Sequence, residues 1–216
     1  MQLLIYGSGG LGRDLCDLAM KLNKTLNVWE RISFIDDIRE ERDFYGVDVL
    51  RFEDALRIKD SSECVIGLGE PFERMRLYKK CKEHGFRFTK LIDPSANISE
   101  SVVIGEGTIV LAFASITGGA EIGRNVVVQQ MVTMGHDTKV DNHAVLSAKA
   151  SLGGGVIIGE RAYIGMGCNV LEKLHIGNDS ILSMGSNVYR AVEDSMVVMG
   201  NPARVIRKNE DHHVFK

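Results

Sequence analysis

His136 and Asp137 are the adjacent side chains best suited to acid–base chemistry in this sequence. Imidazole accepts and releases protons near neutral pH. A neighbouring carboxylate holds the ring in one tautomer and stabilises the imidazolium that forms when a substrate loses a proton. Glycine pairs lie eighteen residues to either side, at 118–119 and 154–155. If the fold stacks residues at this spacing, the pair lies in a groove where a ligand approaches backbone and imidazole together.

A second candidate site is the glycine-rich segment 7–12, whose sequence GSGGLG has the spacing GxGxxG. It follows the apolar run 3–6 and precedes leucines at helical spacing, so we expect a strand before it and a helix after it. Such a loop lets a phosphate approach the backbone and face the helix N-terminus. Asp36 and Asp37 end the next predicted strand, where a carboxylate accepts hydrogen bonds from a ribose or a base.

The elements that position His136 follow from a six-residue period. Sixteen consecutive positions at this spacing carry an aliphatic or Met side chain, and seven of them precede a glycine. Neither a helix, with a period of 3.6, nor a simple strand, with a period of 2, explains this pattern. It is typical of a parallel β-helix, whose stacked coils bury one continuous core, and it turns His136 outward. The sixteen positions are Ile98, Ile104, Val110, Ile116, Ile122, Val128, Met134, Val140, Leu146, Leu152, Ile158, Ile164, Val170, Ile176, Leu182 and Val188.

The first part of the chain lacks this period and alternates predicted strands with predicted helices. This alternation predicts a small parallel sheet of Rossmann type. Only about ninety residues are available, room for one mononucleotide-binding half, so a mononucleotide or nucleotide-sugar fits better than NAD. We expect strands at 3–6, 32–35, 65–68 and 88–92, and helices after residue 10, over 52–58 and from Pro71.

Three parts of the chain follow from these patterns. Residues 1–93 are the expected Rossmann-like nucleotide-sugar-binding domain, and residues 94–208 are the expected β-helix. The segment 200–206 is expected to close the last coil. Residues 209–216 form a polar C-terminal tail, which we expect to be solvated together with its histidines, His212 and His213.

Composition excludes several classes of protein. The formal net charge is -3 and the basic residues are scattered, so no nucleic-acid partner is expected. No apolar stretch has the length of a membrane span, and the N-terminus lacks the basic flank of a signal peptide. We therefore expect a cytoplasmic protein without a membrane partner.

The remaining reactive side chains predict neither a metal site nor a nucleophile. No spacing of His, Cys, Asp and Glu resembles a ligand set, so no metal is expected. His143 falls in a turn register one hexad later, where it could line the same groove as His136, but we expect it to be solvated. The cysteines form no CxxC pair, and we expect reduced, buried thiols at Cys16, Cys64, Cys81 and Cys168.

With these motifs in place, the chain resembles the hexapeptide-repeat sugar O/N-acetyltransferases. This group includes UDP-4-amino-sugar N-acetyltransferases, perosamine N-acetyltransferases and sialic acid O-acetyltransferases. The resemblance covers nearly the whole chain, from the glycine loop through the hexads to the segment GNPAR at 200–204. It implies a left-handed β-helix and a homotrimer, with acetyl-CoA bound between neighbouring subunits and a nucleotide-sugar acceptor bound by the N-terminal domain.

The resemblance also implies residue roles. His136 corresponds to the catalytic base and Asp137 to its acidic partner. The implied nucleotide-sugar contacts are Gly9, Gly10, Leu11, Asp36, Asp37 and Gly69. The implied acetyl-CoA contacts are Val145, Gly154, Met166 and Met184. The chain departs from its relatives at three of these positions: many relatives have His in place of Leu11, some have His in place of Val145, and a small residue is common in place of Met184.

The resemblance therefore implies an acetyl-CoA-dependent N-acetyltransferase acting on the amine of a nucleotide-linked amino-deoxysugar of the UDP-4-amino-sugar type. His136 would deprotonate the amine as it attacks the thioester, without an acyl-enzyme. One alternative is a sialic acid O-acetyltransferase that uses the same base. An alternative of another class is a non-catalytic nucleotide-binding or scaffold protein. An NAD-dependent oxidoreductase is disfavoured by the short N-terminal domain.

Overall fold

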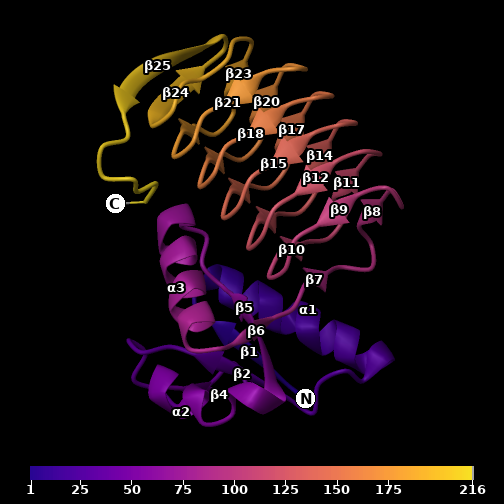
Figure 1. Cartoon of the computed structure of the whole chain (residues 1–216), viewed down its shortest axis with the longest axis vertical. Coiled ribbons are helices and arrows are strands. Elements are labelled where there is room, and N and C mark those ends of the chain that lie inside the picture. The colour runs from indigo at the N-terminus through magenta and orange to yellow at the C-terminus, as the bar shows by residue number, and fades with distance from the viewer. Residues whose placement is uncertain (216) are drawn as a thin grey trace. The chain divides into compact units, whose positions relative to one another are not determined.

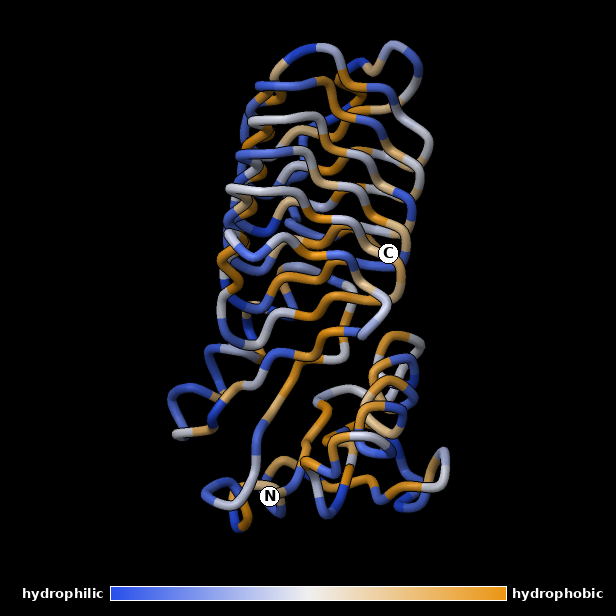
Figure 2. The backbone as a smooth tube through the Cα atoms, turned by 90° about the vertical axis from the view of Figure 1, so that its right-hand side faces the viewer, coloured by the Kyte–Doolittle hydropathy of each residue, from blue (hydrophilic) through white to orange (hydrophobic). Residues whose placement is uncertain are grey.

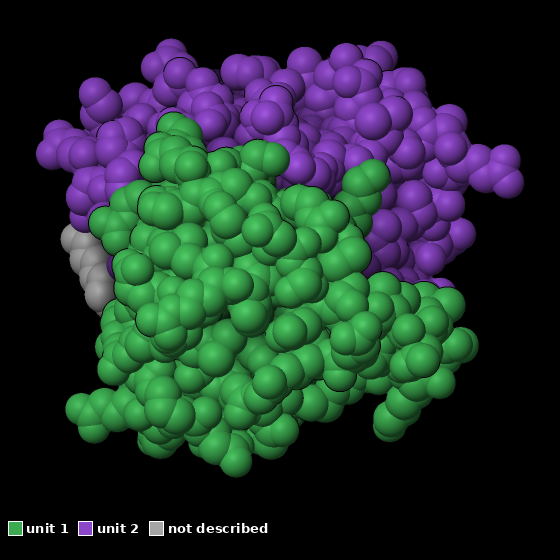
Figure 3. All heavy atoms as spheres, turned by 60° about the horizontal axis from the view of Figure 1, so that its bottom comes forward, with its two compact units in different colours: residues 1–69, 73–91 green, residues 70–72, 92–216 purple. Residues whose placement is uncertain are grey.

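A computed structural model describes residues 1–215, and the chain divides into two units, coloured separately in Figure 3. Unit 1 comprises Met1–Gly69 and Glu73–Leu91, and unit 2 comprises Glu70–Phe72 and Ile92–Lys216. Among residues 1–215, none of the helices combines the length and the apolar character that a membrane crossing requires.

Unit 1 is an α/β domain built on one six-stranded sheet with the order β3-β4-β2-β1-β5-β6 (Figure 1). The central strand β1 pairs in parallel with both β2 and β5, and its inner residues Leu3, Leu4 and Ile5 are completely buried. Strands covered on both faces have such uninterrupted apolar runs. The elements are β1 (Gln2–Tyr6), α1 (Gly10–Leu26), β2 (Arg31–Ile35), β3 (Asp43–Phe44), β4 (Val47–Leu50), α2 (Phe52–Leu56), a 3-10 turn (Lys59–Ser61), β5 (Ser62–Ile66), α3 (Pro71–Glu83) and β6 (Arg87–Phe88).

Two expectations for this sheet are wrong. The sheet is mixed rather than parallel, because β3 pairs antiparallel with β4 around Tyr45 and Gly46. Both turn residues have positive φ, 59° and 72°, the geometry of a tight hairpin whose twist matches that of its strands. The strand expected over residues 88–92 is divided: β6 pairs with β5, whereas β7 (Leu91–Ile92) belongs to a different sheet, described next.

Unit 2 is a parallel β-helix of short strands arranged in three sheets (Figures 1 and 2). The eight-stranded sheet contains β7, β10 (Ile109–Val110), β13 (Val127–Val128), β16 (Val145–Leu146), β19 (Tyr163–Ile164), β22 (Ile181–Leu182), β24 (Met196–Gly200) and β25 (Ala203–Lys208). The six-stranded sheet contains β8 (Asn97–Ile98), β11 (Ser115–Ile116), β14 (Thr133–Met134), β17 (Ser151–Leu152), β20 (Asn169–Val170) and β23 (Asn187–Val188). The five-stranded sheet contains β9 (Val103–Ile104), β12 (Glu121–Ile122), β15 (Lys139–Val140), β18 (Ile157–Ile158) and β21 (His175–Ile176).

The register of these sheets gives coils of eighteen residues, or three hexads, which is the spacing of the glycine pairs from His136 and Asp137. Met134 of β14 lies between Ile116 of β11 and Leu152 of β17, each exactly one coil away in sequence. Every second residue of a strand points to the same face, so a six-residue repeat returns an inward position at each strand. Consecutive strands then fall in different sheets, and every third strand pairs in parallel. The fold class predicted from the sequence, an α/β domain followed by a parallel β-helix, is confirmed.

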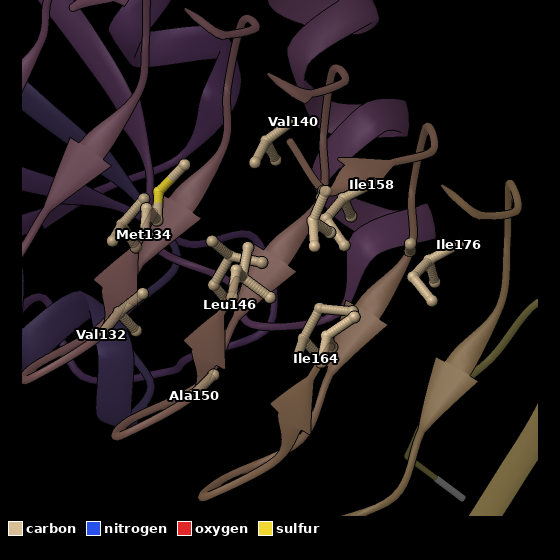
Figure 4. Close-up of a cluster of buried hydrophobic side chains, with 14 of the residues drawn as sticks. Val132, Met134, Val140, Leu146, Ala150, Ile158, Ile164 and Ile176 are labelled. Atoms are coloured by element: carbon tan, nitrogen blue, oxygen red, sulfur yellow. The ribbon is translucent and has the colours of Figure 1, made fainter. Parts of the chain in front are cut away.

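The inward positions form one continuous core along the β-helix (Figure 4). Fourteen of the sixteen hexad residues are buried in it, and Ile98 and Ile104 pack against it partly buried. The small side chains two residues before each hexad position complete the packing. Some of these side chains have a hydroxyl that donates a hydrogen bond to a backbone carbonyl. Thr108 donates to the carbonyl of Gly123 at 2.7 Å, and Ser180 to that of Gly177 at 2.7 Å. Buried polar groups are tolerated only when they are paired in this way.

Strand β18 offers a matched test of this core. Ile158 is completely buried, whereas its neighbour Ile157 points outward and is 39% exposed. We expect Ile158→Ala to lower the free energy of unfolding by about 3 kcal/mol, since it removes buried methyl groups and leaves a cavity. Ile157→Ala should cost less than about 1 kcal/mol. Chemical denaturation of the two variants measures the difference, and equal losses would contradict the assigned inward register.

The C-terminal part of unit 2 is a hairpin followed by an irregular tail. Strand β24 pairs in parallel with β22 and antiparallel with β25, so the segment 200–206 extends the eight-stranded sheet beyond the last coil. The tail is more anchored than expected. The backbone N–H groups of Val214 and Phe215 donate to the Glu70 carboxylate, both at 3.0 Å, and the His212 ring stacks on that of Phe72.

Candidate functional site

His136 and Asp137 form a hydrogen-bonded pair at the corner that follows β14. The Nδ1 atom of His136 lies 2.8 Å from Oδ2 of Asp137, and both side chains are 71% exposed. Neighbouring side chains of a strand point to opposite faces. Here the strand has ended, and the positive φ of Asp137, 58°, turns its carboxylate back to the preceding ring. A short polar residue tolerates this left-handed conformation better than a bulky one.

The hydrogen bond to Asp137 decides which ring nitrogen is available. A carboxylate accepts hydrogen bonds, so the proton of a neutral imidazole lies on Nδ1 in this arrangement. Nε2 then carries the lone pair that accepts a proton. The corner itself is held from both sides, because Gly155 N–H donates to the carbonyl of His136 at 2.7 Å and Asp137 N–H donates to that of Gly118 at 3.1 Å.

The glycines of the neighbouring coils make room for the pair. A Cβ atom on Gly154 would lie 2.6 Å from Nε2 of His136, so the imidazole packs against the bare backbone of Gly154. A Cβ on Gly119 would collide with the Asp137 carboxylate. The structure therefore brings His136, Asp137 and Gly154 together, and no side chain of Gly154 stands between the ring and an incoming ligand.

The other implied acetyl-CoA contacts lie elsewhere on unit 2. Met166 and Met184 are stacked one coil apart at the corner that follows the eight-stranded sheet, and both are exposed. Val145 lies on β16 between Val127 and Tyr163 and is completely buried. Within a single chain, Val145 offers no surface to a ligand.

Neither His143 nor the cysteines add a second reactive site. His143 was expected to be solvated, but it is 5% exposed, and its Nδ1 lies 2.9 Å from the side-chain amide nitrogen of Asn125 one coil away. All four cysteines are buried free thiols. Burial raises the pKa of Cys168 to about 12 and that of Cys16 to about 11, which suppresses the reactive thiolate.

The glycine-rich segment lines a cavity of about 600 Å³ in unit 1. The cavity lies at the carboxyl ends of β1, β2 and β5, where ligands bind in open α/β sheets. All six implied nucleotide-sugar contacts line it. The lining comprises Tyr6, Gly7, Ser8, Gly9, Gly10, Leu11, Ile35, Asp36, Asp37, Ile38, Gly67, Leu68, Gly69, Glu73, Arg76, Leu77 and Lys80.

The start of α1 gives this cavity a site for an anion. Gly9 is the N-cap residue and makes no side-chain capping bond, and the first turn contains no acidic residue. The first N–H groups of a helix have no acceptor within the helix, and its N-terminus carries partial positive charge. Gly12 must lack a side chain, because a Cβ there would collide with the Gly7 carbonyl. Helix α1 can therefore begin directly beneath the glycine loop.

Asp36 holds the cavity wall together. Its carboxylate accepts hydrogen bonds from the hydroxyl and the N–H of Ser8, and from the N–H groups of Ile38 and Arg39, the last two at 3.0 Å. Burial would raise the pKa of Asp36, but the hydrogen bonds from Ser8 and the two loop amides outweigh it and lower the pKa below its ordinary value. With both oxygens so engaged, Asp36 joins the loop after β2 to the glycine loop.

Asp37 belongs to a network that the sequence analysis missed. Its carboxylate accepts hydrogen bonds from the Tyr6 hydroxyl at 2.9 Å and from Phe52 N–H at 2.8 Å. Lys80 donates to the Tyr6 hydroxyl at 3.1 Å. Burial, and then the hydrogen bond to Asp37, raise the pKa of Tyr6 far above its ordinary value, so the hydroxyl keeps its proton. The predicted helix from Pro71, which contains Lys80, could have indicated this network. A helix that follows the third predicted strand begins at the edge of the sheet where Tyr6 and Asp37 lie.

Comparison with known proteins relates both units to one group of enzymes. The family model described as PglD N-terminal domain matches residues 2–81, and the one described as bacterial transferase hexapeptide (six repeats) matches residues 101–136. The chain is 28% identical to the acetyltransferase domain of PglB from Neisseria gonorrhoeae, solved with acetyl coenzyme A. That match covers 95% of this chain and 98% of the other, with a TM-score of 0.88.

Two further solved structures are similar over nearly their whole length. A variant of perosamine N-acetyltransferase from Caulobacter crescentus, in complex with CoA and GDP-perosamine, is 28% identical. It covers 96% of this chain and 98% of its own, with a TM-score of 0.87. WeeI from Acinetobacter baumannii is 26% identical and covers 95% of this chain and 100% of its own, with a TM-score of 0.89.

Proposed function

Because the chain belongs to the PglD-type hexapeptide-repeat sugar N-acetyltransferase family, we propose that it transfers the acetyl group of acetyl-CoA to the amine of a nucleotide-linked amino sugar. It is an acetyl-CoA-dependent sugar acetyltransferase by this homology. The main observation in favour of this chemistry is the exposed imidazole of His136. Its Nδ1 is hydrogen-bonded to Asp137, and its opposite edge packs against Gly154.

In the proposed transfer the acetyl group passes directly from acetyl-CoA to the sugar amine, without an acyl-enzyme. Nε2 of His136 accepts a proton from the sugar amine while the amine nitrogen attacks the thioester carbonyl. The new C–N bond gives a tetrahedral intermediate whose carbonyl oxygen has become an oxyanion. When the carbonyl re-forms, the C–S bond breaks, and the proton passes from the imidazolium to the departing thiolate of CoA. Asp137 stabilises the imidazolium between these events. A backbone N–H near Gly154 is the candidate donor to the oxyanion. Suppressed thiolates at Cys16 and Cys168 are consistent with a mechanism that needs no acyl-enzyme.

We place the acetyl group beside the bare backbone of Gly154, since a Cβ there would occupy the space next to the imidazole. We include Met166 and Met184 in the proposed acetyl-CoA surface, because their exposed side chains remain available to a ligand or a neighbouring subunit. In this proposal the enzyme is a homotrimer, and acetyl-CoA lies between subunits. Val145 is omitted from the proposed contacts, since it is buried within its own chain.

The cavity of unit 1 supports a nucleotide-linked acceptor. It joins a helix N-terminus suited to a phosphate with the Asp37 carboxylate after β2. Each Asp37 oxygen accepts one hydrogen bond within the chain and can accept another from a nucleoside. We propose a 4-amino sugar of the UDP-linked type as the acceptor. The relative from Caulobacter crescentus was solved with GDP-perosamine, so a GDP-linked amino sugar is tested alongside it. O-acetylation of a sialic acid by the same base is the second candidate acceptor chemistry.

Release of free CoA thiol from acetyl-CoA tests the proposal directly. The acceptors are UDP-, GDP- and CMP-linked amino sugars and free sialic acid. We expect turnover with one nucleoside-diphosphate amino sugar and formation of its N-acetyl product, identified by mass spectrometry. Turnover confined to sialic acid would replace N-acetylation by O-acetylation. Binding of acetyl-CoA without turnover of any acceptor would count against a nucleotide-linked amine as substrate.

A further inference from the structure

Ile38 is an apolar side chain that folding leaves in water. It is 92% exposed, although isoleucine is among the residues most often buried. It nevertheless lines the cavity of unit 1, directly after Asp36 and Asp37 at the end of β2. Single exposed apolar residues are common on protein surfaces, so the exposure of Ile38 matters only together with its place at the cavity. The loop that carries Ile38 is held by specific bonds.

The backbone around Ile38 is fixed from several directions. The Asp36 carboxylate accepts the N–H of Ile38 itself and that of Arg39, both at 3.0 Å. The Arg39 side chain donates to the Ser8 hydroxyl at 2.7 Å and lies 3.5 Å from the centroid of the Phe44 ring. These contacts hold the loop without using the Ile38 side chain. Its exposed position is therefore imposed by its neighbours and serves no packing purpose within the chain.

Polar and apolar groups line different parts of the cavity near Ile38. The α1 N-terminus has N–H groups at the glycine loop, whereas the segment after β2 has the Asp37 carboxylate and then the side chain of Ile38. A nucleotide whose phosphates lie at the helix N-terminus extends its ribose to the end of the second strand, and its base continues beyond. A nucleobase has an apolar face that binds well against hydrocarbon or aromatic side chains. Leu11 and Leu68 are further apolar side chains of the lining.

We propose that Ile38 is a substrate-binding residue whose side chain covers one face of the nucleobase of the nucleotide-linked acceptor. This inference rests on the proposed function, because it assigns a residue to the acceptor's base. Contact with a flat apolar face does not read the edge of a base. Ile38 therefore contributes affinity for any nucleobase, and the identity of the base is chosen by other groups of the cavity.

The test compares Ile38→Ser with two controls in the full-length protein. Val28→Ser removes another β-branched side chain that is 44% exposed and lies away from the cavity, and Ile38→Met keeps the apolar surface. Calorimetry with UDP and with GDP measures binding without requiring turnover. We expect Ile38→Ser to raise both dissociation constants about tenfold, since the serine covers far less apolar area. Both control variants should bind within about twofold of wild type.

The kinetic readout follows the same logic. Ile38→Ser should raise KM for the nucleotide sugar by the same factor and leave KM for acetyl-CoA unchanged. Wild-type affinity for UDP and GDP in Ile38→Ser, with wild-type turnover intact, would overturn this inference alone. Nucleotide binding that depends on Ile38 in a protein without acetyl transfer would support the inference and overturn the proposed function. Wild-type protein that binds neither nucleotide would overturn both.

Discussion

The His136→Ala variant is expected to lose turnover by roughly a thousandfold, the middle of the range for removal of a general base. Its KM for acetyl-CoA should stay close to the wild-type value, because the imidazole removes a proton from the amine and is not proposed to bind acetyl-CoA. The side chain is 71% exposed and is hydrogen-bonded to the equally exposed Asp137, so its removal should leave the fold intact. Steady-state thiol release and circular dichroism measure the two effects.

The matched control is His175→Ala. His175 is an exposed histidine on β21, in a sheet other than the one that precedes His136. Its replacement should change kcat by less than about twofold, as expected for a surface residue away from the site. A His136→Ala variant that retains near-normal turnover would refute the assignment of His136 as the base, whatever the acceptor proves to be.

The Gly154→Ala variant should lose turnover by about a hundredfold through the imidazole rather than through the fold, since small displacements of catalytic groups carry costs of this size. The added methyl would lie 2.6 Å from Nε2 of His136, so the exposed ring must swing away. Gly154 does not have the positive φ of its neighbour Gly155, so alanine fits the backbone there. Thermal unfolding should therefore change little, whereas kcat falls.

A double-mutant cycle separates this route from a general disturbance of the coil. If the alanine at 154 acts by displacing the ring, adding it to His136→Ala should cost nothing further, because the displaced group is already gone. Additive losses in the double variant would show that Gly154 serves the reaction independently, for instance through its backbone or the path of acetyl-CoA.

The architecture could be predicted from the sequence because its signals are local and repeated. Met134 and Leu146 occupy equivalent positions of one period, and sixteen repetitions leave no other regular structure that buries them all. The β3–β4 hairpin was missed because Tyr45 and Gly46 form a two-residue turn between strands of only a few residues. So short a strand is stabilised by its partner in the sheet, and sequence pattern says little about it.

Some features of the candidate sites could also be predicted from the sequence, and others could not. The stacking of His136 with Gly154 follows from the eighteen-residue period alone. The environment of His143 does not, because its burial depends on which groups cover one corner of the coil. Asp36 and Asp37 look alike in sequence, yet the first is engaged by loop N–H groups and the second by Tyr6 and Phe52. Such differences arise from hydrogen-bond geometry between segments far apart in the chain.

The stacking of the coils also has a consequence for how this enzyme loses activity. In a solenoid each coil is stabilised by its two neighbours, so local opening starts at the ends, where one neighbour is missing. Strand β14 lies inside its sheet, with β11 and β8 on one side and β17, β20 and β23 on the other. Fraying of either terminus therefore has to melt several coils before it reaches His136. Amide hydrogen exchange should be slow around this corner, and limited proteolysis of the terminal coils should shorten the protein before it disrupts the proposed catalytic pair.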